Sequence, residues 1–102
     1  MGIITEVVTM KLAAQITQDE FISIVDGLEK DFHSKQPGFI DSELIHDQQA
    51  DRWIMIQHWE TMEQLKAASK KIFTDSAAQS FVKSLDPKNV KITIAPQLRA
   101  WK

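Results

Sequence analysis

Residues 52–60 (RWIMIQHWE) restrict the fold more than any other segment, because they alternate as a strand does yet are apolar on both faces. The two faces carry different side chains: Trp53, Met55 and Trp59 on one, Ile54 and Ile56 on the other. Apolar surface on both sides of a strand has to be removed from water on both sides. The segment therefore predicts a sheet with helices on one face and a further layer on the other.

The first helix is predicted by a capping box, in which the Thr17 hydroxyl accepts from the amide of Glu20 while the Glu20 side chain reaches back to the cap amide. An apolar stripe then recurs at three-to-four spacing, formed by Phe21, Ile24, Val25, Leu28 and Phe32. Because the residue before a proline avoids helical geometry, the helix should end before Pro37-Gly38.

A second helical region is predicted to begin at Thr61, which forms a capping box with Gln64. Its stripe is thinner and comes in two parts: Met62, Leu65, Ser69 and Ile72, then Ala78, Phe81, Val82 and Leu85. The polar run 74–76 separates the two parts, which predicts a broken or bent helix.

Strands are predicted over 3–14, 39–47, 52–60 and 90–95, with the middle two forming a hairpin. The element order is thus β-α-β-β-α-β in one domain, residues 1–102. This is the ferredoxin-like α+β fold, a four-stranded antiparallel sheet with its helices on one face.

The uncovered face of such a sheet measures about 400 Å², given strands ~4.8 Å apart and ~20 Å long. That is as large as the apolar patches monomers usually expose. An identical sheet related by a two-fold axis would cover it, so we expect a homodimer through the sheet faces.

Composition excludes several classes of protein. Twelve basic against 14 acidic residues give no electrostatic basis for binding nucleic acid, and 43% apolar residues are typical of a globular chain without a membrane span. The chain has no cysteine, and Glu6 interrupts a signal-peptide pattern, so we expect a cytoplasmic protein. His33, His46 and His58 lack metal-ligand spacing, and no phosphate-binding loop exists, so we expect neither metal nor cofactor.

Two short motifs carry a family resemblance: Gln36-Pro37-Gly38-Phe39 before the second strand, and Trp59-Glu60-Thr61 after the third. The chain resembles the antibiotic biosynthesis monooxygenase-like superfamily of dimeric α/β barrels. The resemblance implies a face-to-face sheet dimer with a pocket between each sheet and its own helices. Members of the superfamily include cofactor-independent oxygenases of polycyclic aromatic molecules, heme-degrading enzymes, isomerase-like and quinone-linked proteins, and many proteins without known activity, so the resemblance alone does not imply one reaction.

The heme-degrading members use an Asn on the first strand and a Trp and a His on the second helical region. Here the first strand has no Asn, and residues 62–85 contain neither Trp nor His, so heme cleavage is not expected. The cofactor-independent oxygenases set Asn, Trp and a basic or phenolic side chain around the substrate. Of these three, only the Trp has a plausible counterpart here, which is Trp59. The chain lacks Tyr, and its one Asn, Asn89, lies in a predicted turn.

His58 and Trp59 are the candidate catalytic residues, the imidazole as general base and the indole as a stacking surface for substrate. The hairpin register decides whether Asp41 or Ser42 lies opposite His58, and only Asp41 would orient the imidazole. Alternatively, His58 is a hydrogen-bonded histidine of the dimer interface. Strand alternation also places His58 and Trp59 on opposite faces, which argues against their sharing one pocket.

Trp53, Phe32 and Phe81 are the candidate substrate-binding residues, since Trp53 shares a strand face with Trp59 and the phenylalanines belong to the helical stripes. Alternatively, Trp53 and Trp59 pack in the core or at an interface, a role that needs no ligand. The leading hypothesis is a monooxygenase-like dimer that oxidises a flat apolar molecule with O₂. The alternative is a non-enzymatic ligand-binding or interaction dimer of the same fold.

Overall fold

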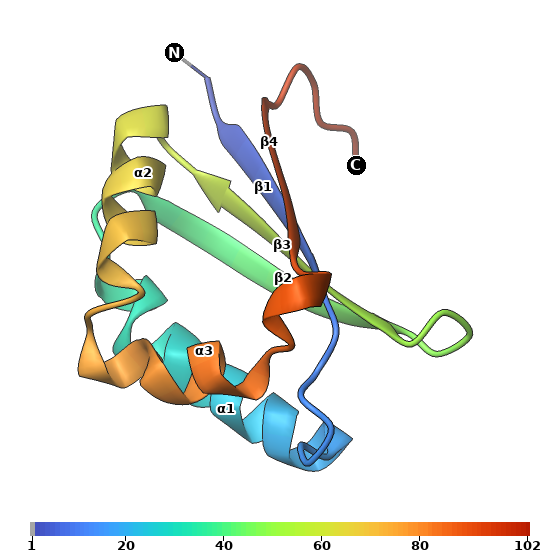
Figure 1. Cartoon of the computed structure of the whole chain (residues 1–102). Coiled ribbons are helices and arrows are strands. Elements are labelled where there is room, and N and C mark those ends of the chain that lie inside the picture. The colour runs from blue at the N-terminus through green and yellow to red at the C-terminus, as the bar shows by residue number, and fades with distance from the viewer. Residues whose placement is uncertain (1) are drawn as a thin grey trace.

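A computed structural model describes residues 2–102 as one antiparallel sheet with its helices on a single face (Figure 1). The strands are β1 (Ile4–Met10), β2 (Phe39–Asp47), β3 (Arg52–Trp59) and β4 (Lys91–Pro96), in the spatial order β2-β3-β1-β4. The helices are α1 (Gln18–Asp31), α2 (Met62–Lys71) and α3 (Gln79–Ser84), with short 3₁₀ turns at His33–Lys35, Ser76–Ala78 and Pro87–Asn89. The predicted ferredoxin-like α+β fold is confirmed. Within the described residues, none of the helices is long and apolar enough to span a bilayer.

Both predicted helix starts are observed. The Thr17 hydroxyl oxygen accepts from the backbone N–H of Glu20 at 3.2 Å, and that of Thr61 accepts from Gln64 at 3.1 Å. The second half of each box differs from the prediction, because the Glu20 and Gln64 side-chain oxygens accept from the threonine hydroxyls instead of from the cap amides. Each threonine thus donates and accepts at its helix terminus.

The second helical region is broken, as its interrupted stripe predicted. After α2, the backbone N–H groups of Thr74 and Asp75 both donate to the carbonyl of Lys71, and the Asp75 carboxylate caps the next turn by accepting from Ala77 at 2.9 Å. The break leaves the β4 side of the sheet thinly covered. Ile92 and Ile94, which pair with helix-facing residues of β1, are accordingly 55% and 39% exposed.

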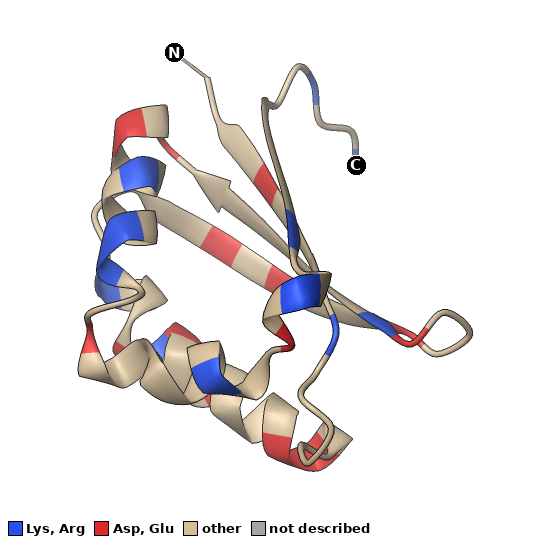
Figure 2. Ribbon diagram, in the orientation of Figure 1, with Lys and Arg blue, Asp and Glu red and all other residues tan. Residues whose placement is uncertain are grey.

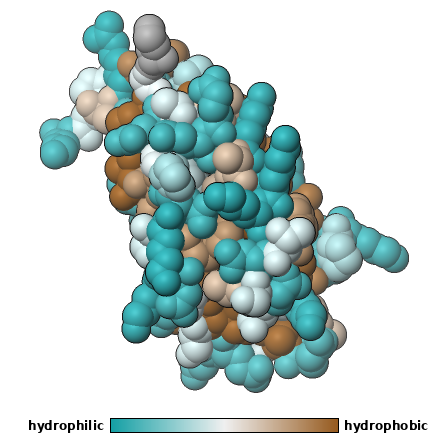
Figure 3. Space-filling model, turned by 90° about the vertical axis from the view of Figure 1, so that its left-hand side faces the viewer, coloured by the Kyte–Doolittle hydropathy of each residue, from teal (hydrophilic) through white to brown (hydrophobic). Residues whose placement is uncertain are grey.

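The core lies between the helices and the alternate residues of β1 and β3. On β3 the buried row is Trp53, Met55, Gln57 and Trp59, each at most 4% exposed, so the predicted face of its apolar members is correct. Against it packs the buried side of α1, formed by Phe21, Val25 and Leu28. Polar side chains cover most of the outer surface on the α2 side, where apolar groups gather only in separate patches (Figure 3).

The other face of the sheet has no covering layer in the described chain. Its centre is apolar: Val7 of β1 lies opposite Ile56 of β3, and Thr9 opposite Ile54. These side chains are half-buried although no helix covers them. The doubly apolar character of β3 is therefore real, and one of its faces remains open.

Gly38 joins the 3₁₀ turn to β2 in a conformation that side chains rarely adopt. Its φ is +84°, and a Cβ placed on it would lie 2.8 Å from the Cβ of Gln64 and closer still to that side chain's end. Its carbonyl accepts from the N–H of Glu60 at 2.8 Å, which ties the start of β2 to the end of β3. A glycine is needed here for both conformation and space.

We expect Gly38→Ala to lower the free energy of unfolding by about 1–3 kcal/mol, because it adds backbone strain and a clash with Gln64. Gly27→Ala is the matched control, since its Cβ would meet nothing within 4 Å and alanine favours α1 by about 0.5–1 kcal/mol. Urea unfolding of both variants checks this. Equal stabilities for the two would contradict the role of Gly38.

Candidate functional site

A cavity of about 310 Å³ lies between the sheet and the second helical region. Its floor comes from β1, β3 and β4, and its walls come from α2, α3 and the segments that connect them to each other and to β4. The lining is mostly apolar and includes Val8, Met55, Trp59, Ile72, Phe73, Phe81, Val82, Leu85 and Ile92. The lining residues come from both sides of the break between α2 and α3.

Apart from the exposed Ser69 of α2, three polar side chains interrupt this apolar lining: Glu6 of β1, His33 of the first 3₁₀ turn and Gln57 of β3. Glu6 and Gln57 lie directly opposite each other on neighbouring strands and both point toward the helices. All three are at most 8% exposed. They set the chemistry available to a molecule in the cavity.

His33 reaches the cavity because α1 ends early. Helical geometry stops at Asp31, and the following 3₁₀ turn turns the imidazole inward, where it stacks on Phe39 with ring centres 5.5 Å apart and meets Trp59 edge-on at 6.1 Å. The aromatic rings hold the imidazole plane in place. A residue near a helix end is thus buried at the centre of the site.

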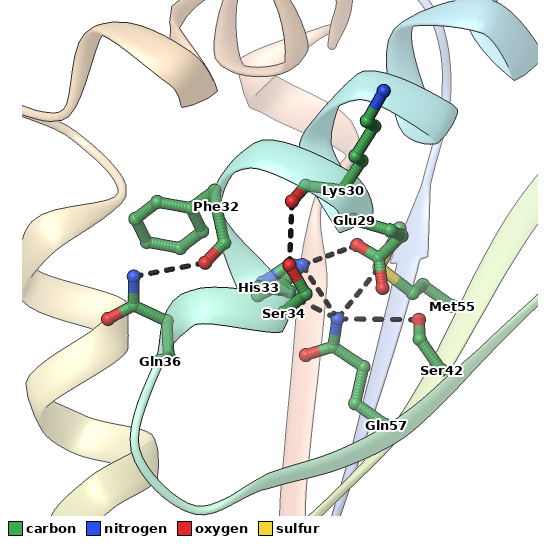
Figure 4. A network of polar contacts seen from close by, with 9 residues as sticks. All are labelled: Glu29, Lys30, Phe32, His33, Ser34, Gln36, Ser42, Met55 and Gln57. Carbon is green, nitrogen blue, oxygen red and sulfur yellow. Dashed lines mark hydrogen bonds and ion pairs between the residues drawn. The ribbon is translucent and has the colours of Figure 1, made fainter.

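A polar network holds His33 from behind (Figure 4). Its Nδ1 contacts a carboxylate oxygen of Glu29, one helical turn earlier, and lies 3.1 Å from the Gln57 side-chain nitrogen. That nitrogen also lies 3.4 Å from the Ser42 hydroxyl and 3.4 Å from the Met55 sulfur. The network joins α1, β2 and β3 and leaves the imidazole little freedom to turn.

Glu6 differs from His33 because no ion pair or hydrogen bond of its side chain is found among residues 2–102. Burial raises the pKa of the Glu6 carboxyl above its ordinary value, and the charge of His33 and the indole N–H of Trp59 lower it only in part. That N–H is itself buried and makes no hydrogen bond of ordinary geometry within the same residues. The site therefore contains a carboxyl and a donor that are both available to a ligand.

The sequence-predicted site residues fall into three groups: two line the cavity, two belong to the core, and one, His58, lies on the open face of the sheet. Trp59 and Phe81 line the cavity. Trp53 and Phe32 do not line it, and belong instead to the core, where Trp53 meets Phe21 edge-on at 4.9 Å and stacks on His46 at 4.1 Å. These two residues therefore pack in the core and do not face the cavity.

His58 lies on the open face of the sheet, whereas Trp59, the next residue of β3, points toward the helices. The hairpin register runs unbroken from the Asp47–Arg52 pair to the Asp41–His58 pair, and Asp41 Oδ1 lies 2.6 Å from His58 Nδ1. The His-carboxylate pair therefore forms, but on the face away from the cavity. His58 and Trp59 cannot act on the same molecule within one subunit, and strand alternation had already indicated this.

Glu6, His33 and Gln57 were missed as site residues by sequence reasoning. The available signal was a polar residue in a row that otherwise faces the core: Glu6 between Ile4 and Val8 on β1, and Gln57 between Met55 and Trp59 on β3. For His33 there was no local signal, because its position depends on where α1 ends.

A second hollow, of about 250 Å³, lies where the start of β4, the end of β1 and the start of β3 meet. It has four cationic side chains along its lining, Lys11, Arg52, Lys88 and Lys91, whose segments converge in Figure 2. Its polar character does not suit a flat apolar ligand. Across residues 2–102, no group of three or more His, Asp or Glu side chains could hold a metal ion.

The family model for antibiotic biosynthesis monooxygenase matches residues 3–72. Solved structures with the same fold include the cofactor-independent oxygenase SnoaB from Streptomyces nogalater, at 15% identity and a TM-score of 0.75, covering 98% of this chain and 97% of that one. A protein from Bordetella bronchiseptica is 13% identical with a TM-score of 0.78, covering 97% and 100%. One from Methanosarcina mazei is 18% identical with a TM-score of 0.71, covering 95% and 94%. No curated protein sequence matches the chain.

The raised pKa of Glu6 predicts a pH-dependent stability. A carboxyl whose pKa is higher in the folded state stabilises the fold below its ordinary pKa, and that contribution is lost as the pH rises through the folded value. We therefore expect Glu6→Gln to unfold at higher urea concentration than wild type at pH 8, with the difference disappearing toward pH 4. A Glu6→Gln variant less stable than wild type at pH 8 would show that favourable contacts hold the carboxylate.

Proposed function

The chain belongs to the antibiotic biosynthesis monooxygenase family, and from that premise we propose that it binds a flat aromatic molecule in the cavity and oxidises it with O₂. The observation that carries the proposal is an apolar cavity lined by Trp59 and Phe81 with an available carboxyl at one point. Ligand cavities usually measure about 300–1,000 Å³, so a volume of about 310 Å³ suits a small aromatic molecule. An apolar lining with few polar groups favours an uncharged ligand.

The chemistry that fits this site needs only a substrate with a weakly held proton. An anthrone, whose CH₂ group lies between aromatic rings and opposite a carbonyl, loses that proton to give an electron-rich anion. The anion reacts with O₂, so that one oxygen atom replaces the two hydrogens of the CH₂ group and the other leaves as water. The equation R₂CH₂ + O₂ → R₂C=O + H₂O balances without an external reductant.

We expect the protein to consume O₂ in the presence of an anthrone, and Trp59→Phe to lower kcat/KM roughly two- to tenfold, because a smaller ring stacks less well on the substrate. Phenylalanine is chosen because Trp59 is only 1% exposed and alanine would leave a hole in the core. Oxygen-electrode rates measure the effect. Rates that Trp59→Phe leaves unchanged would argue against this cavity as the site.

His58→Ala tests whether the His58–Asp41 pair takes part in the reaction. Because His58 lies across the sheet from the cavity, we expect the variant to keep the wild-type rate. A loss of activity would return the role to the His58–Asp41 pair. Tight binding of anthraquinone without O₂ consumption by any variant would favour the alternative, a ligand-binding protein.

We also propose that two chains pair through the open face of the sheet. The supporting observation is the half-buried apolar row of Val7, Ile54 and Ile56, which no other part of residues 2–102 covers. A two-fold pairing of identical sheets would bury it on both subunits.

Sedimentation equilibrium at micromolar concentration is expected to give twice the mass of one chain, and Ile56→Lys to reduce it to one. Lysine at this position places a charge in the centre of the proposed interface. Ile22→Lys is the control, because Ile22 is 40% exposed on α1, on the helical side of the sheet. A wild-type mass of one chain would refute the pairing.

A further inference from the structure

Glu6 is the only carboxyl among the residues that line the cavity. It projects from the central strand β1 between Ile4 and Val8, in register with Gln57 on one side and Ile94 on the other. A carboxyl is a costly choice there, since burying it without a cation or a full set of donors destabilises the fold. Leucine or glutamine would suit the position better if packing were its only role.

The surroundings of Glu6 differ from those of a structural carboxylate. The other acid near His33 is Glu29, which contacts the imidazole directly. Glu6 makes no such contact within the described residues, and Trp59 turns an indole N–H toward it without completing a hydrogen bond. One carboxylate therefore orients His33, whereas the other is left free at the cavity.

Proton exchange is easiest for a group whose pKa lies close to the working pH. Burial moves the pKa of the Glu6 carboxyl upward, toward that range, and the nearby charge of His33 offsets part of this shift. Glu6 therefore suits a group that must first accept a proton and then return it.

We propose that Glu6 is the catalytic base of this cavity, taking a proton from an uncharged substrate that lies against Trp59; this rests on the function proposed above. The C–H bond of the substrate breaks, the proton bonds to a Glu6 carboxylate oxygen, and the electron pair stays on the substrate, delocalised into its carbonyl. Once O₂ has added to that carbon, Glu6 returns the proton to the outer oxygen of the peroxide. The hydroperoxide R₂CH–OOH then loses water to give the ketone.

The same arrangement predicts which substrate charge the site accepts. An anionic aromatic molecule would meet the Glu6 carboxylate in an apolar cavity, and like charges at low dielectric repel strongly. The site should therefore accept neutral anthrones and reject those that carry a carboxylate.

Anaerobic exchange in D₂O isolates the proton step from the oxygen step. NMR follows loss of the CH₂ signal of an anthrone, and we expect wild type to accelerate it, Glu6→Gln to reduce the acceleration by roughly 10²–10⁴-fold, and Glu6→Asp to restore part of it. Glu63→Gln, which changes an exposed acid in the first turn of α2 that does not line the cavity, is the matched control and should behave as wild type. Loss of folding is not expected in Glu6→Gln, because that variant removes a buried charge.

Calorimetric titration with anthraquinone, which has no proton to lose, separates this inference from the proposed function. Dissociation constants for wild type and Glu6→Gln that agree within about threefold, together with loss of exchange only in Glu6→Gln, would support the role of Glu6. Equal exchange by both proteins, or no exchange by a wild type that binds anthraquinone, would overturn it. Absence of anthraquinone binding to wild type would overturn the proposed function, and the role of Glu6 with it.

Discussion

The packing of Trp59 is the interaction on which the rest of the structure depends. Its indole is 1% exposed and lies where β3 meets β1, α2 and the 3₁₀ turn after α1, in a cluster with Ile4, Leu65 and Ala68. It meets Phe39 edge-on at 5.4 Å and His33 at 6.1 Å. One side chain therefore packs between the sheet and α2 and also forms part of the floor of the cavity.

Sequence periodicity predicted the order of elements and the faces of β3, because both depend on neighbouring residues alone. Capping threonines and apolar stripes locate helices within the chain, and alternation assigns Trp59 and His58 to opposite faces whatever the partners of the strand. The contacts that create the site lie beyond such patterns. The inward turn of His33 depends on tertiary packing, and the pairing of His58 with Asp41 instead of Ser42 depends on a hairpin register that the loop residues do not specify by their turn chemistry.

The polar residues of the site show a second limit of prediction from sequence. Glu6 and Gln57 stand in core-facing rows, where their polarity conflicts with the local pattern. Local rules are expected to fail where function requires a costly residue. A polar side chain inside an alternating apolar row is thus a usable sequence signal, although the pattern alone does not distinguish a structural network such as Gln57–His33 from an unpaired group such as Glu6.

The two faces of β3 have different roles: one lines the cavity, and the other is the open face of the sheet. On the helix side, Gln57 and Trp59 belong to the cavity, while on the open side Ile56 and His58 alternate with them along the same backbone. Because strands pack through both faces, a partner sheet pressing on Ile56 would hold the backbone that positions Gln57 against His33. In the proposed dimer, assembly and the site would therefore be joined mechanically, although no side chain would serve both.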